Sequence, residues 1–419
     1  MPLERPLLPL LGPRRALTDF GGSYAGSGVV AFLFSCTGPV AIILSVGAAG
    51  GLSESDIASW LFGGFFLNSL ISVAFSLAYR QPLVFLWSIP GAVLVGPALG
   101  HLSLAEAIGA YLVTGVIMLL LGLSGWVRRA MQAVPMPIVM AMVAGVFLRF
   151  GTGLVRAFAD DLAIALTMCS VWLAFTMVPR LGRVVPPLVA ALVAGAIGIA
   201  LAGTFKPGAG ALFAFAAPNA YTPVFSWPAL VELVVPLAIT VLTVQNAQGI
   251  AILTANGHAP PINAITAACG AGAIVTGLVG AVPTCLTGPV NAVISTAGQK
   301  ERQYTAALLV AVLAGSGDKD RQYSAALFFC VLALAFGLLA PFFTRLLLAT
   351  PPAFIATLAG LAMLRVLQTA FTASFAGPFS FGALICFLVT VADLSILRIG
   401  APFWGLVFGI AASRLLERE

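Results

Sequence analysis

The sequence has little charge, little histidine and no pattern of paired cysteines. Only 8% of its 419 residues are charged and two are histidines, whereas 60% are apolar. An ordinary soluble domain is about 25% charged and about 45–50% apolar. A soluble fold could not cover so much apolar surface, so the composition excludes a cytosolic enzyme, a disordered chain and a nucleic-acid binder. The net charge of +6 is scattered over short gaps between apolar runs, which is typical of membrane topology signals.

The few groups that could carry metal or covalent chemistry are also badly placed for it. The six cysteines lie inside apolar runs without CxxC spacing, and both histidines, His101 and His258, lie at the ends of such runs. We therefore expect no disulfide framework, no metal site and no cofactor. Without a His cluster, a carboxylate pair or a nucleophile–base set, a membrane-embedded enzyme is disfavoured. No cleavable signal peptide is visible before the first apolar run.

Long apolar runs dominate what is present. A helix needs about 20 apolar residues to cross the hydrocarbon of a bilayer. The pattern predicts an all-α polytopic membrane protein with about fourteen spans, of which the third and tenth are broken by glycine and proline. The predicted spans are 27–49, 57–79, 82–100, 103–125, 135–154, 160–179, 185–203, 228–252, 261–281, 283–298, 322–344, 352–370, 377–396 and 400–415.

The basic residues predict the orientation of these spans. If residues 1–26 form a cytoplasmic N-terminal segment, three of every four Lys and Arg residues fall on the cytoplasmic side, as the positive-inside rule requires. Arg365 is then an inner residue and Arg149 an outer one. We expect a multi-pass protein of the cytoplasmic (inner) membrane with both termini in the cytoplasm.

Two halves of the chain resemble each other. Pro137 matches Pro352 and Gly145 matches Gly360, both at an offset of 215, whereas Gly91 matches Gly288 at an offset of 197. The predicted repeats are 27–203 and 228–415, joined by an external loop at 204–227. Because each half has an odd number of spans, seven, the second must be inverted relative to the first. Inverted repeats are typical of secondary transporters, whose site lies between them near the membrane midplane.

A local duplication explains the change of offset. The segment Lys300–Leu308 nearly repeats as Lys319–Leu327. The apolar part of the extra copy is too short to cross a bilayer. We therefore expect the insert, 299–320, to lie in the cytoplasm or at the interface.

The two broken spans occupy corresponding positions in the repeats. Each would start a half-helix near the midplane, whose free N–H groups and positive dipole end suit an anion, particularly a carboxylate. The plainer reading, a simple proline kink, explains one such break better than a symmetric pair. The candidate substrate-binding residues in the breaks are Ser88, Pro90, Gly91, Thr287, Gly288 and Asn291.

Polar and aromatic residues in other spans extend this candidate site. The amides of Gln245, Asn246 and Gln248 lie deep in the eighth span, where facing lipid is costly, so all three should face the interior. We expect Gln245 or Asn246 to contact substrate; the plainer reading is packing contacts between helices. Thr37 lies in a polar stretch of the first span, and Phe34 and Phe85 could stack on a ring. Among the acids, Glu106 follows Ser103 in a capping box, Glu232 lies near an interface and Asp393 lies near Arg398. We expect structural roles for these acids.

These motifs together resemble the benzoate:proton symporter family over nearly the whole chain, from about residue 17. The resemblance rests on Trp87-Ser88-Ile89-Pro90-Gly91-Ala92, on the Gln-Asn-x-x-Gly run at 245–249 and on the run at 135–150 that ends Leu-Arg-Phe. It implies the seven-plus-seven fold of the uracil:proton and sulfate-type transporters. The implied core is 27–125 with 228–344, and the implied gate is 135–203 with 352–415.

The implied activity is import of benzoate or a related aromatic carboxylate with a proton, by a monomer or homodimer in a lipid bilayer, with no nucleic-acid partner. The chain departs from the related uracil carriers, which have an acidic ligand in the eighth span where this chain has Gln245 and Asn246. That difference fits an anionic substrate and leaves the proton site open. The alternatives are a carrier for another organic anion or a nucleobase, and an uncoupled channel-like facilitator.

Overall fold

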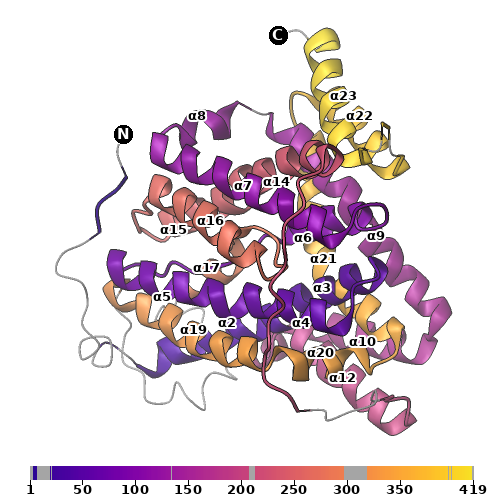
Figure 1. Ribbon diagram of the computed structural model, residues 1–419. Helices are drawn as coiled ribbons and strands as arrows, with labels where there is room; N and C mark the ends of the chain where they lie inside the picture. The colour runs from indigo at the N-terminus through magenta and orange to yellow at the C-terminus, as the bar shows by residue number, and fades with distance from the viewer. Residues whose placement is uncertain are drawn as a thin grey trace.

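The structure is a computed structural model that describes residues 3–6, 19, 21–133, 135–206, 213–296, 319–394, 396–397 and 399–417. Within these ranges seven helices are long and apolar enough to cross a membrane, and six shorter apolar helices accompany them. Each of the fourteen predicted spans has a counterpart (Figure 1). The prediction of an all-α polytopic membrane protein is confirmed. The predicted insert lies outside the described residues except for its last two, which begin a short 3-10 helix, η6 (Lys319–Arg321).

The first repeat contains seven spans and two short connecting helices. The spans are α2–α3 (Gly22–Cys36 and Gly38–Ala49), α4–η1–α5 (Glu54–Phe62, Gly63–Leu67 and Asn68–Tyr79), β1–α6 (Phe85–Trp87 and Ile89–Ala98), α7 (Leu104–Ser124), α9 (Met136–Asp160), α10 (Leu162–Met177) and α12 (Pro187–Ala202). The connectors are α8 (Val127–Gln132) and α11 (Pro179–Val184).

The second repeat has the same plan. Its spans are α13–η2–α14–η3–α15 (Trp227–Ala229, Leu230–Val234, Val235–Ile239, Thr240–Asn246 and Ala247–Ala255), α16 (Ile262–Gly277), β2–α17 (Thr284–Leu286 and Gly288–Ile294), α19 (Tyr323–Leu338), α21 (Pro352–Phe375), α22 (Ser380–Ala392) and α23 (Ala401–Leu416). The connector α20 (Ala340–Leu348) precedes α21.

Spans three and ten cross as a short strand followed by a half-helix, and the strands were not predicted. Pro82 and Pro283 precede them, and prolines at the second helical positions fix the starts of α6 and α17. Strand β1 pairs with β2 in antiparallel fashion. This pairing satisfies backbone groups that could not remain unpaired in hydrocarbon, so two broken spans are tolerated only because they meet.

The register of this strand pair shows the inverted symmetry directly. Phe85 faces Leu286, Leu86 faces Cys285, and Trp87 faces Thr284. Reversing the two strands therefore reproduces the same pairing. The helix caps, Ser88 and Thr287, are equivalent at an offset of 199. The predicted match of Gly91 to Gly288 is thus wrong by two residues, since a Gly-Pro step in one half replaces the Ile-Pro step of the other.

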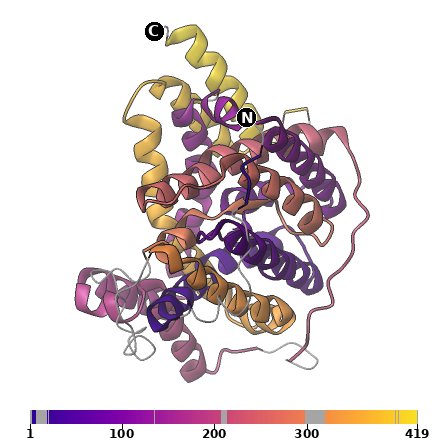
Figure 2. The same ribbon diagram turned by 90° about the vertical axis from the view of Figure 1, so that its left-hand side faces the viewer.

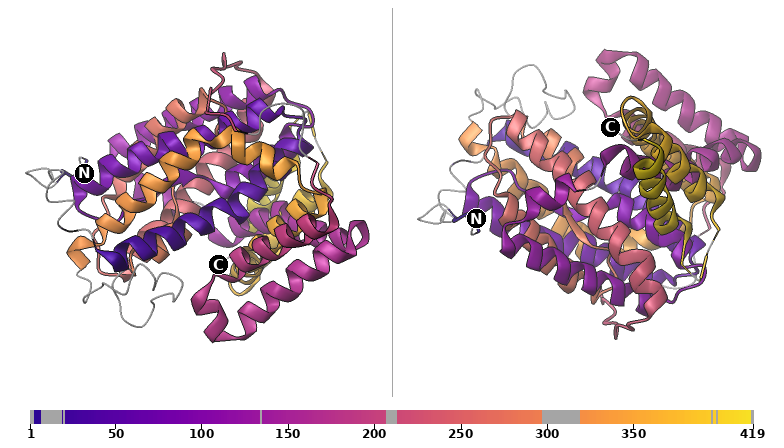
Figure 3. Two further views of the ribbon diagram at one scale, coloured as in Figure 1. Left: turned by 90° about the horizontal axis from the view of Figure 1, so that it is seen from below. Right: turned by 90° about the horizontal axis from the view of Figure 1, so that it is seen from above.

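The helices form two bundles. Helices α9, α10, α12, α21, α22 and α23 pack mainly on one another, and α2, α5, α7, α16 and α19 form the other group. Figure 1 has α22 and α23 at the upper right and α10 and α12 at the lower right, and Figure 3 shows these helices along one side of the molecule. The bundles meet where α6 of the broken third span contacts α9 and where α3 of the first span contacts α21.

The span ends fall into two sets of contacts. On one face, the segment 213–226 crosses the ends of several helices, as Figure 2 shows at the right-hand edge. Its backbone N–H groups at Ala216, Tyr221 and Val224 bond to carbonyls of Leu338, Leu278 and Ala105. On the other face, Glu4 accepts hydrogen bonds from the backbone of Asn263 and Ala264. This arrangement matches the alternation of predicted outer and inner loops.

Candidate functional site

A cavity of about 450 Å³ lies between the two bundles, beside both half-helix starts. This volume is within the range of small-molecule sites. The walls come from the starts of α6 and α17, from η3 and α15, and from α9 and α21. The lining residues are Ile89, Pro90, Met136, Met140, Val143, Phe147, Thr243, Val244, Gln245, Ala247, Gln248, Pro289, Arg365, Val366, Thr369 and Ala373.

The eighth span reaches the cavity through a π-helical segment, η3. Such wide turns are uncommon and often mark functional sites. Gln245 and Gln248 are three positions apart, and both line the cavity. The Oε1 atom of Gln245 is buried and has no hydrogen-bond partner among the described residues. A buried polar group without a partner is costly, so this oxygen is available to a donor on a ligand, and the Nε2 group of the same amide can donate to an acceptor.

Two asparagines predicted as ligands are instead engaged by the strand pair. Asn246 accepts a hydrogen bond from the backbone N–H of Leu286 at 2.8 Å, and its Nδ2 lies 3.5 Å from the Cys269 sulfur. Asn291 accepts from the N–H of Val84 at 3.0 Å and donates to the carbonyl of Val84 at 3.0 Å. Both asparagines are fully buried. Their amides fix β1 and β2 and do not line the cavity.

The residues of the two breaks are also unequal. Pro90 lines the cavity, whereas the Ser88 hydroxyl caps α6 by accepting from the N–H of Gly91 at 3.1 Å. Thr287 occupies the equivalent position before α17 without a side-chain cap. A Cβ atom on Gly288 would lie only 2.4 Å from Gln248 Oε1. Gly288 therefore gives Gln248 the space to lie across the start of α17.

The predicted aromatic and hydroxyl contacts lie outside the cavity lining. Phe85 is fully buried and packs edge-on against Phe75, with ring centroids 5.1 Å apart. Phe34 packs on the main hydrophobic core, and its carbonyl accepts a hydrogen bond from the Thr37 hydroxyl at 2.9 Å. The aromatic ring that does line the cavity is that of Phe147, on α9.

Several lining residues were not among the predicted ligands, of which Gln248, expected only to face the interior, and Arg365 are the most polar. The spacing of Gln245 and Gln248 could have shown that they share a helix face, which Asn246 does not. Arg365 was read only as a topology signal. Its Nη1 donates to Gln368 at 3.3 Å, and no acid lies within ion-pair distance in the part of the chain the structure describes. The cavity thus holds one fixed positive charge.

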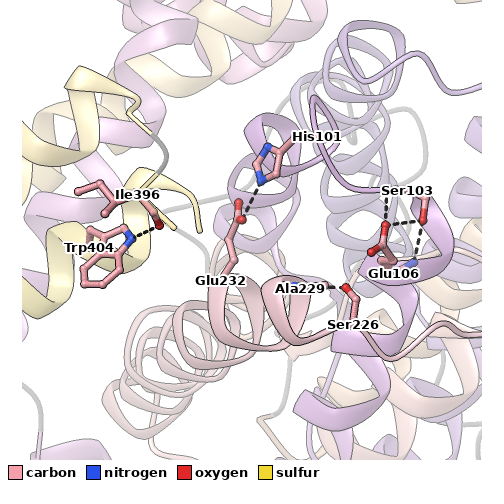
Figure 4. A network of polar contacts seen from close by, with 8 residues as sticks. All are labelled: His101, Ser103, Glu106, Ser226, Ala229, Glu232, Ile396 and Trp404. Atoms are coloured by element: carbon pink, nitrogen blue, oxygen red, sulfur yellow. Dashed lines mark hydrogen bonds and ion pairs between the residues drawn. The ribbon is translucent and has the colours of Figure 1, made fainter. Parts of the chain in front are cut away.

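The acids lie away from this cavity, on the face covered by segment 213–226. Glu106 forms the predicted capping box with Ser103, which is confirmed (Figure 4). Glu232 is 4% exposed and lies 2.9 Å from the Nε2 atom of His101. Asp393 pairs with Arg149 at 3.4 Å, and the predicted partner Arg398 lies outside the described residues. None of these acids lines the cavity, so its polar groups are amides, hydroxyls and Arg365.

Solved structures with the same fold include two transporters. The transmembrane domain of a cyanobacterial bicarbonate transporter, BicA, aligns with a TM-score of 0.61 at 16% identity, covering 96% of this chain and 99% of that one. The murine anion transporter Slc26a9 in its inward-facing state aligns with a TM-score of 0.57 at 14% identity, covering 94% of this chain and 68% of that one. Identities this low show the fold alone.

Sequence relatives agree with the fold. The inner membrane protein YdcO of Escherichia coli is 29% identical over 395 residues, which cover 91% of this chain and 93% of that protein. The benzoate membrane transport protein of Acinetobacter baylyi is 26% identical over 406 residues, covering 95% and 96%. The family model for the benzoate membrane transport protein matches residues 18–415. The protein is a multi-pass membrane transporter and not an enzyme, and the chain belongs to the benzoate membrane transport protein family.

Proposed function

We propose that the protein imports benzoate or a related aromatic carboxylate together with a proton across the cytoplasmic membrane. The observation that carries this proposal is the cavity between the bundles, which combines a mostly apolar wall with amides and one arginine. A flat ring needs apolar walls, and a carboxylate needs donors. Family membership and the relative named as a benzoate transporter support the same class of substrate.

The carboxylate would bind at the polar end of the cavity. The start of α6 supplies positive dipole charge beside Pro90, and α17 begins at the opposite side. Gln245 and Gln248 supply amides that can donate to carboxylate oxygens, and Arg365 supplies long-range attraction. Ser88, Gly91, Thr287 and Gly288 would act by shaping these starts. Asn246 and Asn291 would act by holding the strands from which the half-helices begin.

The ring would lie against the gate. Met140, Val143 and Phe147 of α9 and Val366 of α21 form the apolar wall. Methionine side chains are adaptable and make favourable contacts with aromatic rings. The predicted stacking partners Phe34 and Phe85 would act indirectly, from the packed interior of the core.

Alternating access would come from motion of one bundle against the other. We propose the core as 27–125 with 228–344, and the gate as 135–203 with 352–415. With both termini in the cytoplasm, Met136 and Thr369 lie toward the inner ends of their helices, so the described cavity corresponds to an inward-facing arrangement. The predicted homodimer would leave this internal motion unchanged.

Flux measurements in vesicles made from the purified protein test the proposal. Labelled benzoate should accumulate when an inward proton gradient is applied. Unlabelled aromatic carboxylates should inhibit this uptake more strongly than nucleobases do. Uptake of benzoate down its own gradient that is unchanged when the proton gradient is collapsed would favour an uncoupled facilitator. Uptake of nucleobases but not of carboxylates would favour the alternative substrate class.

A further inference from the structure

Arg149 and Arg365 occupy nearly the same place in the two repeats, one residue apart in the register set by Gly145 and Gly360. Each lies thirteen positions after the first residue of its helix, which is Met136 in α9 and Pro352 in α21. The two helices are equivalent spans of an inverted repeat, so their arginines point toward opposite membrane faces. The sequence places Arg149 at the outer face and Arg365 at the inner face.

Their present surroundings differ. Arg365 lines the cavity, where its hydrogen bond goes to the uncharged amide of Gln368. Arg149 lies outside that cavity, beyond Phe147, and its Nη2 is 3.4 Å from Oδ2 of Asp393. One guanidinium therefore faces an open space of about 450 Å³, and its counterpart faces a carboxylate that belongs to the protein.

Arg149 also approaches the core half-helix. A Cβ atom on Gly96, near the end of α6, would lie 3.9 Å from Nη1 of Arg149. Asp393 follows directly after α22, so Arg149 and Asp393 both belong to the gate. The Arg149–Asp393 pair thus lies on the gate beside α6 of the core, outside the cavity that holds Arg365.

We propose that Arg149 is a second anion subsite, which receives the substrate carboxylate from outside when the outer side opens, and that Asp393 occupies it while that side is closed. This inference rests on the proposed function. In inverted-repeat transporters the two halves exchange conformations between the outward-facing and inward-facing states. That exchange would give Arg149 the open surroundings that Arg365 has now.

The chemistry of the pair suits such an exchange. A guanidinium binds carboxylates through paired hydrogen bonds, so the Asp393 side chain presents the same group as an aromatic carboxylate. The Arg149 side chain is 42% exposed and that of Asp393 is 52% exposed. Ion pairs this exposed are weak, so a substrate carboxylate can replace Asp393 at little cost.

The inference is tested by measuring substrate affinity separately on each side of the membrane. Uptake into cells reports the outer side, and efflux from preloaded cells reports the inner side. Arg149→Gln should raise the half-saturating outside concentration for uptake by about tenfold or more, as expected for loss of a charged hydrogen bond. The half-saturating inside concentration for efflux should stay within about twofold of wild type. Arg365→Gln should show the reverse, and Arg149→Lys should restore part of the outside affinity because it keeps the charge.

The Asp393→Asn variant distinguishes an anion subsite at Arg149 from an Arg149–Asp393 ion pair that only stabilises the structure. If Asp393 only occupies the subsite, Asp393→Asn should lower the half-saturating outside concentration for uptake or leave it unchanged, whereas Arg149→Gln raises it. If the ion pair only stabilises the structure, both variants should raise that concentration. Equal effects of Arg149→Gln on uptake and efflux, or no effect on either, would overturn the inference. Failure of the wild-type protein to move any carboxylate would instead overturn the proposed function.

A cysteine reporter gives a readout that does not depend on affinity. Gly96→Cys places a thiol beside Arg149 without a close contact, in a background where the partly exposed Cys36 and Cys169 are alanine. Adding Asp393→Asn should increase labelling by a membrane-impermeant reagent from outside, since the Arg149 guanidinium, no longer paired with a carboxylate, stabilises the reactive thiolate. Unchanged labelling would show that Asp393 does not occupy the Arg149 guanidinium. The same background without Gly96→Cys is the control.

Discussion

Gln245 and Asn246 are adjacent residues with amides in different surroundings. The helix turns the first toward the cavity, and the second toward Leu286 in the strand pair. Their sequence neighbourhoods are nearly identical, so sequence alone could not separate a ligand from a structural contact. The unpaired Oε1 of Gln245 and the paired Oδ1 of Asn246 separate them in the structure.

Alanine substitutions at these two positions should therefore fail in different ways. Gln245→Ala should weaken benzoate binding by about tenfold, as for one lost hydrogen bond, with little change in thermal stability. Asn246→Ala leaves the buried N–H of Leu286 unpaired, which costs about 1–3 kcal/mol and should lower the melting temperature. Equilibrium binding and thermal unfolding in detergent measure the two effects. A Gln245→Ala protein with normal affinity and transport would remove this amide from the site.

His258 is a residue outside the spans, between α15 and α16. Its Nε2 lies 2.8 Å from Oε1 of Gln322, at the start of the eleventh span. Burial lowers the pKa of this imidazole below its usual value, and nearby Lys319 adds to the lowering, although the hydrogen bond to Gln322 and the charge of Asp320 act in the opposite direction. The folded protein thus favours the neutral imidazole.

This shift predicts how stability depends on pH. The folded-state pKa of His258 is below the unfolded value of about 6.5. The contribution of the neutral imidazole to the free energy of unfolding is therefore present above about pH 6.5 and is lost as the pH falls through the folded-state pKa. The melting temperature of the wild type should fall more steeply below about pH 6.5 than that of His258→Asn. Parallel pH profiles from thermal unfolding make the comparison. Identical profiles would show that His258 does not titrate in this range.

At the scale of elements, the broken spans show how far sequence reasoning reaches. Proline removes a helical hydrogen bond and glycine weakens a helix, so the Pro and Gly pairs in the third and tenth spans predicted both breaks. The strands were not, because each has three residues and is stabilised by a partner in the other repeat. Gly91 and Gly288 were matched by residue type, and only the strand register gives the correct match of Ser88 to Thr287.

Some residues of the cavity could be predicted from the sequence, and others could not. Polar residues inside a span pointed to the eighth span, and its helical period could have added Gln248. Arg365 was not recognisable, because an arginine near the end of a span usually marks topology. Its place in the cavity depends on how α21 packs against the core, which no local pattern records.

The start of α17 provides a test at this scale. Gly288→Ala should displace Gln248, whose Oε1 would lie 2.4 Å from the new Cβ. If binding is lost through Gln248, then Gly288→Ala combined with Gln248→Ala should weaken benzoate binding no more than the worse single variant. Titration calorimetry on the four proteins gives the cycle. Additive losses would mean that Gly288 acts independently, through the backbone of the half-helix.

At the scale of the molecule, the interface between the two bundles differs between its two ends. One end holds the cavity with Arg365, and the other end has the Arg149–Asp393 pair on the gate beside α6. That end also carries a buried carboxylate against the gate, because a Cβ on Gly400 would lie 2.3 Å from Oε1 of Glu232. A protein with inverted repeats can adopt this asymmetry in either direction.

The direction of the asymmetry can be measured with a matched pair of cysteines on α21. Thr369 lines the cavity, whereas Thr372, one turn further on, is exposed and lies outside it. Their hydroxyls both bond to the carbonyl four residues earlier, so the two substitutions remove equivalent hydrogen bonds. In a background with Cys36 and Cys169 replaced by alanine, Thr369→Cys should react with an impermeant thiol reagent from the cytoplasmic side. Benzoate should slow this reaction by occupying the cavity, and should leave any reaction of Thr372→Cys unchanged.

Labelling of Thr369→Cys from outside alone would reverse the proposed orientation. Reaction at Thr369→Cys that benzoate does not slow would place the substrate elsewhere, and equal protection of both cysteines would indicate a change of conformation in place of direct occupation.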